Sequence, residues 1–257
     1  MQGIGIDVGS LTTKAVARGE AGVLAQVLLP TGSLPRRAAG EAYRQVVART
    51  DGTGWPVVVT GYGRLDVPFP ARRVTEITCH AAGIRLLFPA ARTIVDVGGQ
   101  DSKVIGLDGE GRVRDFAMND RCAAGTGRFL EVMAGALGVE VGRLASLANA
   151  SGREITISNL CTVFAESEVI SHLAQGVSRE DIAAALHRAV ARRVHGLAGR
   201  VGLEPEVAFT GGVALNQGVT GEFARLVGRP LLLPKEPQFT GALGAALLAG
   251  RGPGESP

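Results

Sequence analysis

Short apolar runs bounded by glycine-rich turns fill the beginning of the chain and predict β-strands. The run from Gly3 to Asp7 leads into a Ser/Thr-rich turn, and the run from Val23 to Leu29 follows a turn at Gly19 to Gly22. Val57 to Gly61 has the same character. Brief apolar runs between turn signals are typical of buried strands.

Longer stretches carry apolar residues at helical spacing and predict amphipathic helices. Helices are expected over Pro35–Thr50, Ile77–Phe88, Ser178–Val201 and Thr240–Ala249. The segment Val207–Asn216 predicts a strand, a Gly-Gly turn and a helix, and Leu231–Leu233 predicts a short strand. We expect the last residues, from Gly250 to Pro257, to be frayed. Strands that alternate with helices indicate an α/β protein.

The opening pattern returns near residue 96 with the same order of strand, glycine turn and strand. At a constant offset, Asp7, Val8, Gly9 and Lys14 recur as Asp96, Val97, Gly98 and Lys103. An internal duplication of this kind predicts two similar lobes that face each other.

The turns of both copies have the composition of a phosphate-binding site. Backbone amides and hydroxyls in a tight turn bind phosphate oxygens, a lysine neutralises charge, and an aspartate can hold a hydrated metal ion. The first copy offers Asp7, Gly9, Ser10, Leu11, Thr12, Thr13 and Lys14, and the second offers Asp96, Gly98, Gly99, Gln100 and Asp101. A third turn, Gly211-Gly212 with Asn216, could hold a flat adenosine against bare backbone. Neither a P-loop pattern nor a Rossmann pattern is present.

Two cysteines stand at the expected entries to helices. Cys122 precedes Gly125-Thr126-Gly127 and a helical pattern that begins at Phe129. Cys161 follows the capping residues Ser158 and Asn159, and Gly176 would end its helix. A helix N-terminus lowers the pKa of a thiol and favours an anionic cluster. Buried, inert thiols are the alternative. If the two are iron–sulfur ligands, a second chain must supply the other two thiolates.

Composition narrows the protein class without deciding the function. The chain has 257 residues, a net charge of +3 and 46% hydrophobic residues, which suits a soluble α/β protein of one large or two modest domains. No basic run resembles a nucleic-acid-binding arm, and no apolar run is long enough to span a membrane. The three cysteines do not form a disulfide framework, and no signal peptide precedes the first strand, so we expect a cytoplasmic protein.

The three turns together resemble the acetate kinase, sugar kinase, Hsp70 and actin superfamily. Within it, seven segments closely resemble the activator (ATPase) component of 2-hydroxyacyl-CoA dehydratases, in the BadF/BadG/BcrA/BcrD ATPase family. They are TGYGR, EITCHA, DVGGQDSK, MNDRCAAGTGRF, CTVFAESEVI, TGGVALN and GALGAALLA. The resemblance runs from Ile4 to about Ala249. MNDRCAAGTGRF and CTVFAESEVI are the most specific of the seven.

This resemblance implies duplicated ribonuclease H-like lobes with a nucleotide cleft between them. We expect residues 1–91 to form lobe I, completed by a C-terminal helix over 238–250, and residues 92–237 to form lobe II. The resemblance also implies a homodimer that shares one [4Fe-4S] cluster through Cys122 and Cys161. A flavodoxin or ferredoxin would reduce it, and ATP hydrolysis would drive a low-potential electron to a 2-hydroxyacyl-CoA dehydratase. Cys79 and His80 are interpreted as packed residues.

The resemblance also assigns roles around the nucleotide. Asp7 and Asp96 would hold magnesium, mostly through water, and Gln100 or Asp101 would position the attacking water. Gly211, Gly212 and Asn216 would hold the adenosine of ATP or ADP, with Gln238 and Gly241 near it. Two alternatives stay open: an ATPase subunit of benzoyl-CoA reductase or activator of a double-cubane reductase, and a small-molecule kinase of the same superfamily. A nucleotide-sensing regulator is disfavoured because no partner domain is attached.

Overall fold

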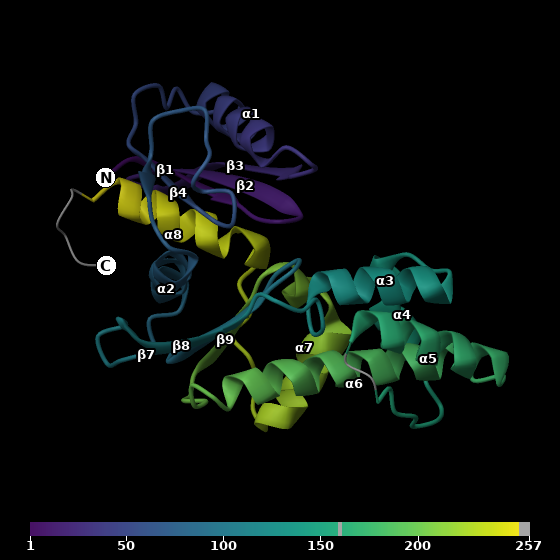
Figure 1. The fold of residues 1–257 in the computed structure, drawn as a ribbon. Helices are drawn as coiled ribbons and strands as arrows, with labels where there is room; N and C mark the ends of the chain where they lie inside the picture. The colour runs from purple at the N-terminus through teal and green to yellow at the C-terminus, as the bar shows by residue number, and fades with distance from the viewer. Residues whose placement is uncertain (159–160, 252–257) are drawn as a thin grey trace.

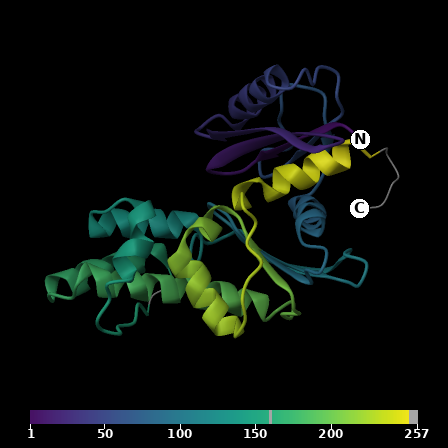
Figure 2. The same cartoon turned by 180° about the vertical axis from the view of Figure 1, so that it is seen from behind.

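Two β-sheets, each flanked by helices, make up the protein in a computed structural model that describes residues 1–158 and 161–251 (Figures 1 and 2). The N-terminal sheet has the strand order β3-β2-β1-β4-β5, and the C-terminal sheet has the order β8-β7-β6-β9. The first contains β1 (Gly3–Val8), β2 (Thr12–Gly19), β3 (Gly22–Pro30), β4 (Val57–Thr60) and β5 (Arg72–Arg73). The second contains β6 (Thr93–Val97), β7 (Ser102–Leu107), β8 (Val113–Asn119) and β9 (Val207–Thr210).

The two sheets repeat one topology, which confirms the duplication predicted from the sequence. In each, three antiparallel strands form a meander, and a later strand joins the first in parallel: β4 beside β1, and β9 beside β6. Asp7 pairs with Lys14 in the first sheet as Asp96 pairs with Lys103 in the second. The repeated residues therefore occupy equivalent positions at the ends of equivalent strands.

Helices cover both sheets and extend the second half sideways (Figure 1). They are α1 (Pro35–Ala48), α2 (Glu76–Leu87), α3 (Gly127–Leu137), α4 (Leu144–Ala148), α5 (Thr162–Ala174), α6 (Arg179–Ala198), α7 (Gln217–Val227) and α8 (Thr240–Ala249). Short 3₁₀ turns lie at Val141–Arg143, Gly212–Leu215 and Pro237–Phe239. In the described ranges no helix is both long enough and apolar enough to cross a membrane.

Helices α2 and α8 lie between the two sheets, where they pack on each other (Figures 1 and 2). Cys79 and Ala82 of α2 share an apolar cluster with Val58 of β4 and with α8. The opposite side of α2 packs through Ile77 and Ile84 against the C-terminal sheet. Helix α2 thus connects the two halves, and a change in their relative position has to involve it.

The largest core belongs to the C-terminal half. Buried side chains of α3 and α6, such as Phe129 and Leu186, pack with Val95 of β6 and with Phe209 and Phe223. The rings of Phe209 and Phe223 meet edge to face with centroids 5.2 Å apart. This core fixes the first turns of α3 beside the ends of the strands, where the cavity described below is formed.

Several sequence predictions differ from the structure. Leu231–Leu233 is not a strand: only Leu232 bridges to Ala208, because prolines on either side supply no N–H to a ladder. After Gly211 the chain forms a 3₁₀ turn, and Asn216 then caps α7 through a bond from the Val219 N–H. The end predicted to fray is described only to residue 251, so 252–257 lie outside the described residues.

Candidate active site

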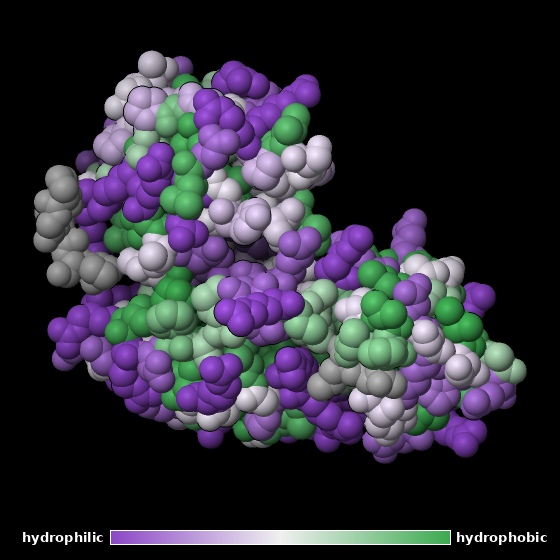
Figure 3. Space-filling view, viewed as in Figure 1, coloured by the Kyte–Doolittle hydropathy of each residue, from purple (hydrophilic) through white to green (hydrophobic). Residues whose placement is uncertain are grey.

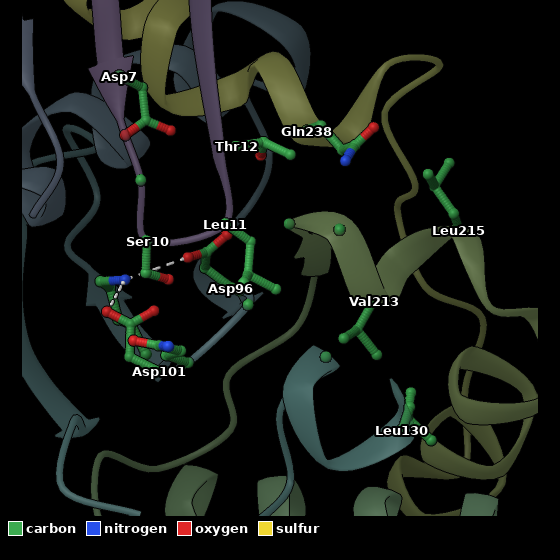
Figure 4. Close-up of a pocket in the computed structure, with 18 of the residues that line it drawn as sticks. Asp7, Ser10, Leu11, Thr12, Asp96, Asp101, Leu130, Val213, Leu215 and Gln238 are labelled. Carbon is green, nitrogen blue, oxygen red and sulfur yellow. Dashed lines mark hydrogen bonds and ion pairs between the residues drawn. The ribbon is translucent and has the colours of Figure 1, made fainter. Parts of the chain in front are cut away.

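A cavity of about 550 Å³ lies between the two sheets and receives the turns of both (Figures 3 and 4). The volume suits a nucleotide-sized ligand. Its polar end is formed by the β1–β2 and β6–β7 turns, as Figure 4 shows for Asp7, Ser10, Asp96 and Asp101. The two turns touch: a Cβ built on Gly99 would lie 2.6 Å from Leu11 Cδ1.

Each turn is closed by the same internal bond and carries the same ion pair. The Gly9 N–H donates to the Thr12 carbonyl at 3.1 Å, and the Gly98 N–H donates to the Asp101 carbonyl at 2.9 Å. Lys14 Nζ lies 2.9 Å from Asp7 Oδ2. The two turns therefore offer paired backbone amides, hydroxyls and charges to one ligand from opposite sides.

Asp96 is ionised despite its burial. Desolvation would raise the pKa of this carboxyl, but electrostatic interaction with His80, Lys103 and Lys14 holds it below its usual value. Lys14 belongs to the N-terminal sheet, so the two sheets already interact electrostatically at this carboxylate. Asp7 and Asp96 together form an anionic pair suited to a hydrated magnesium ion. Among described residues, no group of three acids, histidines or cysteines is placed to hold a metal ion.

Glycines behind both aspartates let the backbone approach closely. Gly61 follows β4 and Gly211 follows β9, and their φ angles are +90° and +86°. A Cβ on Gly61 would lie 2.5 Å from Asp7 Oδ1, and one on Gly211 would lie 2.8 Å from Asp96 Oδ1. Any larger residue would displace the carboxylate as well as strain the backbone.

The far end of the cavity is apolar and suits a flat base. Leu130 of α3 and Val213 and Leu215 of the 3₁₀ turn lie at this end (Figure 4), and Val141 and Ala145 also line the cavity. Gly212 presents bare backbone there, and a Cβ on it would lie 3.6 Å from the Gln238 amide nitrogen. A charged end and an apolar end fit the phosphates and the base of one nucleotide.

Comparison with known proteins identifies this arrangement. The profile of the BadF/BadG/BcrA/BcrD ATPase family matches residues 4–249. The chain belongs to this ATPase family. It is 48% identical to the activator of lactoyl-CoA dehydratase of Anaerotignum propionicum, over 97% of both chains. It is 46% identical to the 2-hydroxyisocaproyl-CoA dehydratase activator of Clostridioides difficile, over 97% of this chain and 95% of that one.

Solved structures agree with this membership. The activator of the 2-hydroxyisocaproyl-CoA dehydratase from Clostridium difficile with bound ADPNP superposes with a TM-score of 0.90 and 43% identity, covering 97% of this chain and 94% of that one. A glucokinase of the ROK family from Streptomyces griseus shares 16% identity and a TM-score of 0.57, covering 98% of this chain and all of that one. The second likeness shows the fold alone, which is the predicted kinase-like superfamily fold.

Fifteen of the residues predicted for the nucleotide site line the cavity. These are Asp7, Gly9, Ser10, Leu11, Thr12, Lys14, Asp96, Gly98, Gly99, Gln100, Asp101, Gly211, Gly212, Asn216 and Gln238. Thr13 and Gly241 are not among the lining residues. Thr13 is fully buried on the opposite side of β2 and bonds to Thr31 at 2.9 Å, because successive strand residues face opposite ways. Gly241 instead leaves room between Asp7 and His80.

The two family cysteines lie away from this cavity, near the surface. Cys161 is exposed and is the N-cap residue of α5, in agreement with the prediction. Cys122 is partly exposed but lies in an irregular loop before α3, which begins only at Gly127. Ser158, the expected cap of α5, instead donates through its N–H and its hydroxyl to the Glu168 carboxylate. The other expected capping residue, Asn159, lies outside the described residues. Cys79 is fully buried, and desolvation raises its pKa to about 12.

Sequence reasoning missed several charged or polar residues that line the cavity, three of which lie close to the duplicated turn at Asp96. Glu76 and His80 come from α2, and Lys103 comes from β7. The spacing of Glu76 and His80 within EITCHA puts both on one side of a helix, and Lys103 is the duplicate of Lys14. Those two signals could have added them to the site. The apolar residues from α3, α4 and the 3₁₀ turns carry no such local signal.

Proposed function

We propose that this protein is the ATP-hydrolysing activator of a 2-hydroxyacyl-CoA dehydratase. One observation carries the proposal: two duplicated Asp–Lys turns meet over a single cavity in a chain that also presents two family cysteines near its surface. The relatives named above, 46% and 48% identical, are activators of dehydratases that act on 2-hydroxyacyl-CoA compounds. The division into lobes at residues 1–91 with 238–250, and 92–237, is part of the proposal.

Nucleotide binding uses the two ends of the cavity. Asp7 and Asp96 hold magnesium through water, and the amides and hydroxyls at Gly9, Ser10, Thr12 and Gly99 receive the phosphates. Lys14 neutralises phosphate charge, while Gln100 or Asp101 positions the attacking water. The adenosine lies between the Gly211-Gly212 backbone and the apolar side chains at the far end. Gln238 closes this end, and Asn216 keeps an amide nitrogen free after its oxygen has capped α7.

Cys122 and Cys161 fit two ligand positions of an iron–sulfur cluster. Cys161 is exposed and Cys122 is partly exposed, and Asn119 fixes the loop by donating to the Cys122 carbonyl at 2.8 Å. A [4Fe-4S] cluster takes four thiolates, so two copies of the chain supply two each across a two-fold axis. Exposed apolar side chains follow Cys161 on α5, at Val163, Phe164 and Ile170. A partner subunit would cover this surface.

Hydrogen bonds connect the phosphate turn to the cysteine loop. The first N–H groups of α3, at Gly127 and Arg128, donate to the carbonyls of Gly98 and Gly99 at 2.9 and 2.8 Å. Ser102 also donates to the Gly125 carbonyl at 3.1 Å. A shift of the β6–β7 turn upon hydrolysis therefore pulls on the segment that carries Cys122. When bound, the cluster would supply the dehydratase with one low-potential electron received from a flavodoxin or ferredoxin.

Iron analysis and sedimentation of anaerobically purified protein test the cysteine assignment. We expect wild-type protein to hold about four irons per dimer, and Cys122→Ser to lose the iron and weaken the dimer while still binding ATP. Cys79→Ala is the matched control, because its buried thiol is not a ligand, and it should keep the iron. Four irons on an isolated wild-type monomer, or a fully loaded Cys122→Ser dimer, would refute the shared cluster.

A further inference from the structure

Helix α2 turns two polar side chains toward the C-terminal sheet across the gap between the halves. Glu76 and His80 lie one helical turn apart on the same side of the helix. Glu76 Oε2 lies 2.7 Å from Lys103 Nζ, and His80 Nε2 lies 3.6 Å from Asp96 Oδ2. Both partners belong to the second copy of the duplicated turn. We call Glu76 and His80 the α2 pair.

Lys103 is a charge buried at a fixed point between three carboxylates. It is 2% exposed, and its ammonium lies 2.7 Å from Asp101 and 3.5 Å from Asp96 in addition to Glu76. Burial would lower the pKa of Lys103, but these three acids together raise it. The lysine is therefore charged, and its position is defined by two short bonds, one from each half of the molecule.

His80 is a buried polar ring that ordinary packing does not explain. It is 6% exposed, and its Nδ1 has no hydrogen-bond partner. An unsatisfied buried nitrogen costs stability, so a tightly packed apolar residue would be favoured if packing were its only role. Its Nε2 faces the carboxylates instead: a Cβ on Gly241 would lie 3.1 Å from Nε2 and 3.5 Å from Asp7 Oδ2. The bare Gly241 leaves the imidazole room between Asp7 and Asp96.

We propose that Glu76 and His80 are positioning residues for ATP hydrolysis, which hold Lys103 and Asp96 in place from the opposite half of the molecule. Helix α2 packs on α8 and β4 on one side and on the C-terminal sheet on the other. A movement between the halves thus changes the surroundings of Asp96 and Asp101 directly. The proposal rests on the ATPase function proposed above and does not depend on the cluster.

The test compares steady-state ATP hydrolysis with ADP binding by calorimetry, on protein purified anaerobically. We expect Glu76→Gln and His80→Leu to lower kcat roughly 10- to 100-fold, because misplaced catalytic groups cost rate more than ground-state affinity. The Kd for ADP should change by less than about threefold. His80→Gln should recover much of kcat, because its amide nitrogen can replace Nε2. Glu41→Gln makes the same chemical change on α1, outside the cavity, and should match wild type.

A double substitution separates positioning from a loss of stability. If Glu76 acts through Lys103, Glu76→Gln should cost little more in a Lys103→Gln background, so that the two effects on kcat are far from additive. Additive effects, or an unchanged kcat in both Glu76→Gln and His80→Leu, would overturn the proposal. If Lys103→Gln fails to fold, the comparison of kcat between His80→Leu and His80→Gln tests the positioning role by itself. Variants with a normal iron content and an altered kcat would leave the cluster proposal intact, so the positioning proposal and the cluster proposal can fail separately.

Discussion

Asp7 and Asp96 end equivalent strands, yet their surroundings differ. In the described part of the chain, Asp7 forms one ion pair, with Lys14 at 2.9 Å, whereas Asp96 lies within 3.6 Å of both Lys103 and His80. The duplicated Asp–Lys pattern therefore has different electrostatic surroundings in its two copies. The difference arises because the α2 side chains Glu76 and His80 make their short polar contacts with Lys103 and Asp96 of the second copy.

We expect Asp7→Asn and Asp96→Asn each to lower the ATPase rate at least about 10²-fold. Each change removes one charge from the proposed magnesium site while it keeps the side-chain volume. The measurement is phosphate release at saturating ATP and magnesium. Asp66→Asn, an exposed acid paired with Arg36, is the matched control and should hydrolyse ATP normally. Near-normal turnover in both cavity variants would show that the cavity is not the hydrolytic site.

His187 should make the folded protein sensitive to acid. Burial lowers its pKa from 6.5 to about 4, and neither ring nitrogen has a hydrogen-bond partner. The unfolded chain therefore binds a proton below pH 6.5 that the folded chain accepts only near pH 4. Stability falls as the pH drops through this window, by up to about 3 kcal/mol from this group. Denaturant titrations from pH 7 to 5 should show a weaker pH dependence for His187→Leu; equal slopes would contradict this.

At the scale of elements, the approach of α2 to α8 depends on small residues. A Cβ built on Gly244 of α8 would lie 1.8 Å from the Cys79 carbonyl oxygen, and one on Gly83 would lie 2.3 Å from the Thr240 carbonyl oxygen. The backbones of the two helices are in direct contact, and this contact keeps Glu76 and His80 among the residues that line the cavity. Ala/Gly composition in α8 is therefore a packing requirement.

Gly244→Ala should destabilise the protein by more than about 3 kcal/mol, because the contact is with backbone and cannot be relieved by a side-chain rotation. The measurement is the thermal unfolding midpoint. Gly196→Ala on α6 is the matched control, since a Cβ there meets nothing within 4 Å. It should be neutral or stabilising by up to about 1 kcal/mol, because alanine is the better helix former. A Gly244→Ala midpoint equal to wild type would contradict the packing argument.

At the scale of the whole molecule, two halves meet at one cavity, and a chain of hydrogen bonds leads from it to the Cys122 loop. The turn at Gly98 and Gly99 accepts the first N–H groups of α3. Helix α5 contacts α3, and Cys161 is its N-cap residue. If the proposed function holds, a change at the nucleotide cavity would therefore reach both cysteines through one packed helical layer.

Chelator access to the iron should therefore depend on the nucleotide. We expect the rate of iron loss to differ by at least about threefold between saturating ADP and a non-hydrolysable ATP analogue, because a ligand shifts a conformational equilibrium by its differential affinity. The measurement is absorbance of the chelator–iron complex under anaerobic conditions, with nucleotide-free protein as the baseline. Identical rates in all three states would rule out the coupling but not the hydrolysis.

Local patterns in the sequence determined most of the strands, the long helices and the duplicated turns. Asp7, Lys14 and their duplicates could be found because they sit at fixed distances from apolar runs, and hydrophobic periodicity is a local property. The two cysteines were singled out as candidates from their own neighbours in the chain, and so was the Gly-Gly turn, which lines the cavity. The resemblance of whole motifs added the family.

Tertiary structure decided what those patterns could not encode. Thr13 lies among candidate residues in the chain, but strand alternation and the bond to Thr31 turn it away from the ligand. Glu76 and His80 become site residues only because α2 packs between the two sheets, and Leu130 joins the base end only when α3 reaches the β6–β7 turn. These contacts join residues far apart in sequence, and their free energy depends on the packing of the whole chain, so no local pattern reports them.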